Sequence, residues 1–161
     1  MMIVHTHRMT PDKRNPLGPT GETVRANLQR LREGRNLGYI KLARMLDEIG
    51  RPIPELGLRR IEAGDRRVDV DDLMALAAVL GVSPISLLLP GMPGADQSDD
   101  PVAAPGEEVT AGRLWLWLKA DEPLPGYTRP RRGFWVDSRP EWDPGPGDPR
   151  LWSTEASDGD D

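Results

Sequence analysis

The side chains best suited to contact another molecule lie in residues 52–67, PIPELGLRRIEAGDRR. Pro54 suits the first position of a helix, where a missing N–H costs nothing, and Gly64 can end that helix in the left-handed conformation. Leu58 and Ile61 are three residues apart and can face one core. The other faces of the helix and the turn after it carry Glu55, Leu56, Arg59, Arg60, Arg66 and Arg67. By itself this is the pattern of any surface helix, so its neighbours must decide its role.

Groups able to perform covalent or metal catalysis are scarce. The 161 residues include no cysteine, which excludes a disulfide framework, a zinc-thiolate site and a cysteine nucleophile. His5 and His7 have no further His or Cys to complete a metal site. The sequence has no phosphate-binding, dinucleotide-binding, zinc-protease or nucleophile-elbow motif, and Lys119 is the only lysine available to a Ser–Lys dyad in the C-terminal part. We therefore expect a protein that is not an enzyme, with no metal and no cofactor.

The formal net charge of −5 is unevenly distributed. Residues 1–21 carry a net charge of +2, residues 22–90 of +1 and residues 91–161 of −8. The acidity therefore belongs to the C-terminal part, and the central part is close to neutral. No apolar run approaches the roughly 20 residues of a membrane span, and the first residues lack the apolar core of a signal peptide. We expect a cytoplasmic protein with no membrane partner.

Helical periodicity organises residues 22–90. Capping residues and apolar stripes predict five short helices, which begin near Thr23, Tyr39, Pro54, Asp69 and Ser83. A Gly/Pro turn separates the second helix, over residues 39–49, from the third, over residues 54–63. Five short helices with short joints predict a compact all-α domain.

Two adjacent motifs give this pattern a family resemblance. Residues 58–66, LRRIEAGDR, follow I-x-x-I-E-x-G-x-R, and residues 73–83, LMALAAVLGVS, follow L-x-x-L-A-x-x-L-G-V-S. Together they resemble the Cro/C1-type (XRE family) helix-turn-helix of bacterial and phage repressors, over roughly residues 24–89. The joint DEIGRPIP resembles an actinobacterial or actinobacteriophage variant. The resemblance implies a five-helix lambda-repressor-like fold and a repressor that binds double-stranded DNA as a homodimer.

The resemblance also implies roles for individual residues. The helix over residues 54–63 would lie in the major groove. Side chains matching the family's base-reading positions are Glu55, Leu56 and Arg60, and those matching phosphate contacts are Tyr39, Arg59, Arg66 and Arg67. Arg32 and Glu62 match an ion pair that joins the first and third helices. Arg60 could donate two hydrogen bonds to guanine, and Leu56 could touch a thymine methyl group.

Two positions depart from the family pattern. Gly38-Tyr39 replaces the usual Ser-Gln, so the Tyr39 hydroxyl would have to take over a phosphate contact. Gly57 stands where Ser or Thr is common; it either permits close approach to DNA or reflects crowding. These departures and the nearly neutral central part leave an alternative open: a protein-interaction adaptor, or an antitoxin-like protein, on a helix-turn-helix scaffold.

The rest of the chain has a different composition. We predict a flexible arm over residues 1–21, an acidic linker over residues 91–109, a Trp/Pro-rich region over residues 110–152 and a disordered acidic tail over residues 153–161. The Trp/Pro-rich region is expected to be mostly irregular, with one short helix capped by Thr110.

The short C-terminal helix, AGRLWLWLKA, is apolar nearly all round. Leu114, Trp117 and Leu118 share one face, and Trp115 lies on another. The helix could pack back on the central domain as a small satellite core. Alternatively, Trp115, Trp117 and Leu118 could form a dimer or protein-partner surface, since exposed Trp and Leu mark interaction sites. A Trp-lined ligand pocket is a third possibility.

Overall fold

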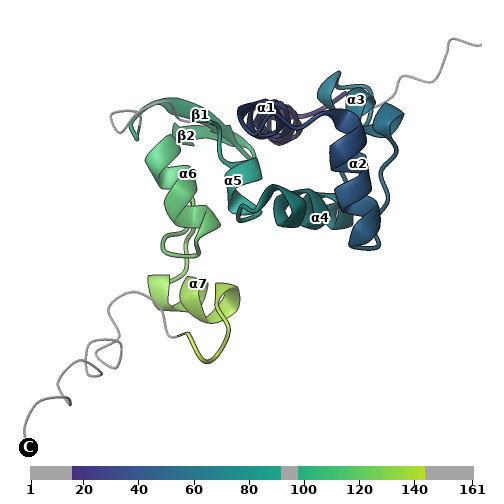
Figure 1. The fold of residues 1–161 in the computed structure, drawn as a ribbon. Helices are drawn as coiled ribbons and strands as arrows, with labels where there is room; N and C mark the ends of the chain where they lie inside the picture. The colour runs from purple at the N-terminus through teal and green to yellow at the C-terminus, as the bar shows by residue number, and fades with distance from the viewer. Residues whose placement is uncertain (1–15, 92–97, 144–161) are drawn as a thin grey trace, which may run out of the picture.

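The computed structural model describes residues 16–91 and 98–143. Within these residues it has seven helices and one two-stranded antiparallel sheet (Figure 1). Five helices form what we call the five-helix unit: α1 (Pro19–Gly34), α2 (Tyr39–Glu48), α3 (Glu55–Glu62), α4 (Val70–Leu80) and α5 (Ile85–Leu88). The C-terminal unit, residues 98–143, consists of β1 (Pro101–Ala104), β2 (Glu107–Thr110), α6 (Ala111–Leu118) and α7 (Arg131–Ser138).

One apolar core holds the five-helix unit together. Its fully buried members come from every helix and from the joint before α3, and include Leu28, Leu42, Leu46, Ile53, Leu58, Leu76 and Leu87. Each such side chain contributes about 1.5–3 kcal/mol when removed from water. The buried amide of Asn27 donates to the carbonyl oxygens of Leu87 (3.2 Å) and Leu89 (2.6 Å), which ties the end of α5 to α1.

The caps of α4 follow the sequence, whereas the start of α1 does not. The Asp69 carboxylate accepts the backbone N–H of Asp72 at 2.7 Å, and Gly81 ends α4 with φ of 64°. α1 begins at Pro19, so the expected cap at Thr23 is wrong and residues 19–21 belong to a helix rather than to an arm. Proline is tolerated in a first helical turn because its N–H is not needed there. Residues 1–15 of the predicted arm lie outside the described residues.

A β-hairpin occupies residues 101–110, the latter part of the predicted acidic linker, so the all-α prediction is wrong for this segment, and residues 92–97 of the linker lie outside the described residues. β1 and β2 pair in the register Pro101↔Thr110 to Ala104↔Glu107, and Gly106 turns the chain with φ of 84°. Ala104 and Val109 face inward onto Leu114 of α6, and this contact gives the acidic segment an apolar surface to fold on.

The Trp-rich helix packs as a satellite core. Leu114 is buried in α6, and Trp117 and Leu118 pack beside it together with Leu89 from the end of α5. Trp115 points to solvent, with 40% of its surface exposed. The sequence did not predict the second helix of this region, α7. Phe134 is its buried residue, and Trp135 donates its ring N–H to the Asp121 carbonyl oxygen at 2.8 Å. The region is therefore more regular than predicted up to residue 143, and residues 144–161 lie outside the described residues.

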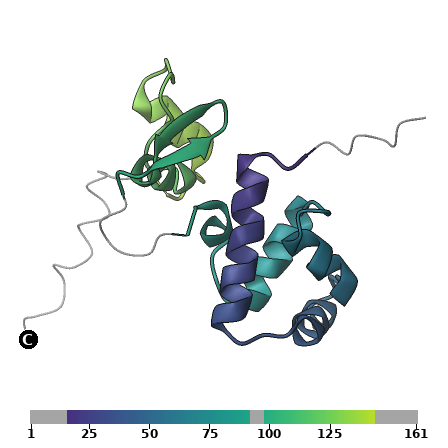
Figure 2. The same cartoon turned by 90° about the horizontal axis from the view of Figure 1, so that it is seen from above.

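The C-terminal unit lies beside α1 and α5, on the side of the molecule away from α2 and α3 (Figures 1 and 2). The outward faces of α2 and α3 are therefore left uncovered by it. None of the helices within the described residues is long and apolar enough to cross a membrane.

Candidate nucleic-acid interface

α2 and α3 pack against each other. Leu42 and Leu46 anchor α2 in the core, and Leu58 and Ile61 anchor α3. Leu56 does not share the inward face of Leu58 and Ile61 and is 67% exposed. Arg59 and Arg60 are also exposed. The sequence thus divides α3 into an inner aliphatic face and an outer face with cationic and apolar groups.

A buried ion pair fixes α3 to α1. Arg32 Nε donates to Glu62 Oε1 at 2.7 Å, and Arg32 Nη2 donates to Glu62 Oε2 at 2.8 Å. Only 11% of the Arg32 side chain and 5% of the Glu62 side chain are exposed. Arg32 Nη1 also donates to the Leu37 carbonyl oxygen at 3.1 Å. The hydrogen bonds to Glu62 raise the pKa of Arg32 above its ordinary value. The sequence predicted this pairing, and the structure brings the two residues together.

Tyr39 belongs to the same cluster. Its hydroxyl donates to Glu62 Oε2 at 2.7 Å, and burial raises its pKa above the ordinary value. The Arg32 and Arg59 guanidinium carbons lie 4.2 Å and 4.4 Å from the centre of the Tyr39 ring. The hydroxyl predicted to hold a phosphate is therefore already occupied within the fold. Tyr39 joins α1, α2 and α3 instead.

Two of the predicted contact residues bind each other. Arg59 donates from Nη2 to Glu55 Oε1 at 2.7 Å, one helical turn away, and both side chains are more than one-third exposed. Exposed i, i+4 pairs contribute only about 0.3–0.5 kcal/mol, so either residue can exchange its partner for another ligand. The Arg60 side chain, by contrast, makes no hydrogen bond or ion pair with the part of the chain that the structure describes. Arg60 and Leu56 are the outward groups of α3 that are ready to bind.

Arg66 is committed to a different contact. Its Nη2 lies 2.8 Å from Asp72 Oδ2, and the Asp72 side chain is 3% exposed. Arg51 Nε binds the other carboxylate oxygen of Asp72 at 2.8 Å. Arg66 therefore shares a buried carboxylate with Arg51, and the structure engages it within the fold, whereas the sequence predicted it as a phosphate contact.

The same arginine explains the glycine in α3. A Cβ on Gly57 would lie 2.7 Å from Arg66 Nη1 and 3.2 Å from Ile53 Cγ2. Gly57 is buried, so of the two alternatives the structure favours crowding over close approach to DNA. The Arg66 guanidinium lies against α3 at Gly57 while it binds Asp72.

Arg67 remains exposed at the α3–α4 turn, where its Nη2 donates to the Pro16 carbonyl oxygen at 2.7 Å. Sequence reasoning missed Arg51 and Asp72, which clamp this turn together with Asp69. Arg51 Nη2 lies 3.0 Å from Asp69 Oδ2. The signal available was the acidic run Asp69-Val70-Asp71-Asp72 close to Arg66, which the sequence analysis treated only as a helix cap.

Within the described residues no cluster of His, Cys, Asp and Glu could hold a metal ion. Of the predicted interaction surface in α6, Trp117 and Leu118 are largely used in packing and Trp115 remains at the surface, with its ring 5.3 Å from Lys119 Nζ. Comparisons with protein-family models, curated proteins and solved structures found no match to this chain.

Proposed function

We propose that this chain is a sequence-specific DNA-binding transcription regulator, a repressor that acts as a homodimer. In this proposal α2 and α3 form a helix-turn-helix, and α3 lies in the major groove. The observation that carries the proposal is the outer face of α3, where exposed Arg60 and Leu56 stand on a helix whose inner face is fixed by core packing and by the Arg32–Glu62 pair. A rigidly held helix with an unengaged arginine suits base reading.

The proposed contacts follow from the geometry of each side chain. Arg60 donates two hydrogen bonds to O6 and N7 of guanine, and Leu56 packs against a thymine methyl group. Arg59 leaves Glu55 for a phosphate, and the exposed pair costs little to open. Glu55 is then free to accept from cytosine N4. Arg67 adds a second phosphate contact, whereas Arg66 and Tyr39 hold the fold and reach DNA only indirectly.

Selection of duplexes from a random pool by the full chain tests this proposal. We expect an enriched motif containing guanine, whose preference weakens in Arg60→Ala by about 1–3 kcal/mol at that base pair. Arg132→Ala, which removes an exposed arginine from α7 on the far side of the molecule, is the matched control and should leave the motif unchanged. Failure to enrich any motif, or equal effects of the two variants, would contradict the proposal.

The homodimer makes a separate prediction about the motif. Two copies related by a two-fold axis would place their α3 helices about 34 Å apart, one turn of DNA. The selected sequence should then contain two inverted half-sites with that spacing. Sedimentation of the protein with the duplex should show two chains per site; one chain on a single half-site would count against the dimer.

A second candidate is a protein-interaction adaptor. Each of α2 and α3 exposes a large aliphatic side chain, Ile40 at 64% on α2 and Leu56 at 67% on α3. Several cations nearby are already paired within the fold. A salt titration separates the two functions: DNA affinity should fall steeply and linearly with the logarithm of salt concentration, and an apolar protein contact should not.

A further inference from the structure

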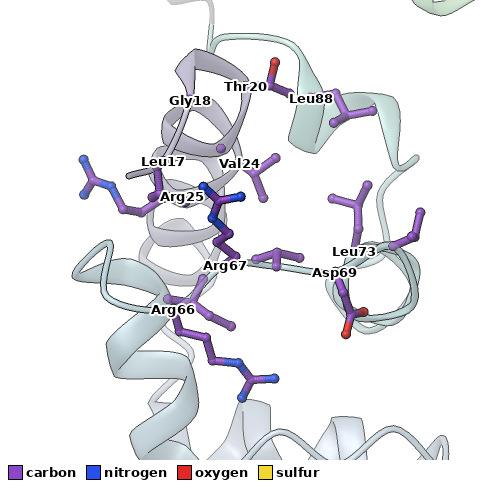
Figure 3. A pocket seen from close by; sticks show the side chains of 14 residues that line it. Leu17, Gly18, Thr20, Val24, Arg25, Arg66, Arg67, Asp69, Leu73 and Leu88 are labelled. Carbon is purple, nitrogen blue, oxygen red and sulfur yellow. The ribbon is translucent and has the colours of Figure 1, made fainter. Parts of the chain in front are cut away.

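A cavity of about 460 Å³ opens on the five-helix unit between the N-terminal end of α1, the α3–α4 turn, the start of α4, and α5 (Figure 3). Its lining includes neither Leu56 nor Arg60, the proposed base-reading groups. Seven aliphatic side chains line it: Leu17, Val24, Ile61, Val68, Val70, Leu73 and Leu88. Of these only Val24 and Ile61 are buried, and Val70 is 77% exposed, so the apolar lining is left partly open to solvent.

The charged side chains that line the cavity all have partners within the fold. The contacts are Arg25 with Glu22 at 2.8 Å, Arg66 with Asp72 at 2.8 Å, Asp69 with Arg51 at 3.0 Å, and Arg67 with the Pro16 carbonyl oxygen at 2.7 Å. A charged occupant would have to compete with these contacts. An apolar occupant would only cover the aliphatic lining, which is favourable in proportion to the area removed from water.

The described part of the chain begins at the wall of this cavity. Pro16 is its first residue, and its carbonyl oxygen accepts a hydrogen bond from Arg67 in the α3–α4 turn. Leu17 lines the cavity beside α1 (Figure 3), and a Cβ added at Gly21 would lie only 3.1 Å from Leu17 Cδ2. Residues 1–15 lie outside the described residues, but they are attached to the fold at the cavity itself.

We propose that the apolar run Met-Met-Ile-Val at residues 1–4 occupies this cavity, with Ile3 and Val4 against its aliphatic side chains. Eleven residues join Val4 to Pro16, and they can span about 36–40 Å when extended, which is ample for a return to the cavity. A short flexible connection of this kind gives an effective concentration in the millimolar range. The cavity would therefore be filled even by a contact too weak to hold a free peptide.

The point of attachment also decides between the two ends of the chain. Residues 144–161 contain a second apolar pair, Leu151-Trp152, and they too lie outside the described residues. That segment, however, is attached at Asp143 in the C-terminal unit, and none of the residues that line the cavity belongs to this unit. The first segment is the one that starts from the cavity.

Docking of residues 1–4 would act on the α3–α4 turn. Arg67, proposed above as a phosphate contact, donates to Pro16 at the start of the connection. A docked segment keeps Pro16 in this place, so it competes with a DNA phosphate for the guanidinium, and release of the segment should raise DNA affinity. This consequence rests on the proposed function, whereas the docking itself does not.

The test is paramagnetic NMR on the full chain without DNA, with the isoleucine, leucine and valine methyl groups isotopically labelled. The chain has no cysteine, so His5→Cys provides a single site for a nitroxide beside the proposed docking residues. We expect the nitroxide to broaden the methyl signals of Val24, Leu73 and Leu88, which come from α1, α4 and α5. Without the nitroxide, nuclear Overhauser contacts should join the Ile3 and Val4 methyl groups to the same three residues.

Two double variants of the first segment test whether the apolar side chains cause the docking. The variant Ile3→Asp, Val4→Asp should lose the broadening of the cavity methyl groups. The variant Thr6→Asp, Thr10→Asp adds the same charge to the same segment outside the apolar run, and should keep it. None of these positions belongs to the core of the five-helix unit, so both variants should fold.

Several results would overturn the proposal. One is the absence of broadening and of nuclear Overhauser contacts at the cavity, and another is equal broadening in the two double variants. Broadening that appears only when a nitroxide-bearing chain is mixed with a separate methyl-labelled chain would assign the cavity to a second copy. Broadening from a nitroxide at Thr154→Cys in place of His5→Cys would assign it to the C-terminal segment.

The outcome is separable from that of the proposed function. A chain that binds a duplex but shows no docking would refute this inference and leave the proposed function standing. Docking of residues 1–4 in a chain that binds no duplex would do the reverse.

Discussion

Replacing Arg32 with alanine removes the cation from a buried ion pair and leaves its partner in place. Glu62, 7% exposed, would keep the Tyr39 hydroxyl at 2.7 Å as its polar contact and lose both bonds to the guanidinium. Removing one member of a buried pair costs about 3–5 kcal/mol, because the remaining charge stays in a poorly solvated site. That is a large share of the roughly 5–15 kcal/mol that stabilises a typical domain.

The assay follows urea unfolding by far-UV circular dichroism, since the five-helix unit contributes most of the helix. Of the five tryptophans, four lie in the C-terminal unit and Trp152 lies outside the described residues, so tryptophan fluorescence follows mainly the C-terminal unit, including the packing of Trp117 beside Leu89. Arg35→Ala is the matched control. This arginine lies at the C-terminal end of α1, is exposed and makes one described side-chain bond, to the Leu31 carbonyl oxygen at 3.2 Å. It should cost no more than about 0.5 kcal/mol.

An unfolding free energy for Arg32→Ala within about 1 kcal/mol of the Arg35→Ala value would refute this reasoning, since a buried pair should cost several times more. Such a result would mean that Glu62, once separated from Arg32, is hydrated or protonated at little cost in unfolding free energy. The double variant Arg32→Met, Glu62→Met adds a second check. Replacing both charges with apolar groups of similar length should recover much of the loss.

Three further predictions concern the residues around this pair. Gly57→Ala should destabilise the fold by about 1–3 kcal/mol by crowding Arg66 away from Asp72. In an Arg66→Ala background the loss should be smaller, because the new Cβ then meets only Ile53 Cγ2 at 3.2 Å and alanine favours the helix; stabilisation by Gly57→Ala in the native background would disprove the contact. Tyr39→Phe should cost about 1.5–3 kcal/mol, the value of a hydrogen bond to a charged group, and a smaller loss in calorimetry would show that the hydroxyl contributes little. The hydrogen bond from the backbone N–H of Asp72 holds the pKa of Asp69 below its usual range. The ionised Asp69 carboxylate therefore stabilises the fold above about pH 4, and this stabilisation is lost as pH falls through the lower pKa of the folded state. Asp69→Asn should flatten the acid side of a plot of unfolding free energy against pH, and an unchanged plot would contradict this role of Asp69.

The helices that the sequence predicts well carry their own signals. α4 has an Asp cap, a periodic apolar face and a glycine stop, and each is present in the structure. α3, Glu55–Glu62, is one residue shorter at each end than the predicted helix over residues 54–63: Pro54 is extended and precedes the first helical residue instead of occupying it, and Gly64 follows the helix with φ of 82°. Such short-range signals do not depend on the rest of the fold, and so they can be read from one sequence.

The hairpin and α7 could not be predicted because their stability comes from distant contacts. The hairpin's acidic, proline- and glycine-containing sequence is typical of a linker, and its inward side chains are the small residues Ala104, Val109 and, partly buried, Val102. Those small side chains need Leu114 of α6 and Leu89, just after α5, to complete an apolar cluster. Composition over a short window does not contain that information.

The candidate site was predictable in its pairing but not in its detailed roles. Arg32 and Glu62 were identified through the family resemblance. The hydrogen bonds from Tyr39 to Glu62 and from Arg66 to Asp72 depend on how the helices that carry these residues are placed in space. Spacing along the chain gives the position of a polar side chain on its helix, but not which of several partners it binds.

The central claim is that α3 reads base edges in the major groove, and methylation interference on a selected duplex tests it most directly. Methylation of guanine N7 blocks the acceptor that Arg60 would use, so we expect N7-methylated guanines within each half-site to be excluded from the bound fraction. Methylation of adenine N3, in the minor groove, should have no effect. Binding that is indifferent to guanine N7 methylation, or is blocked from the minor groove instead, would contradict the assignment of α3 as the reading helix.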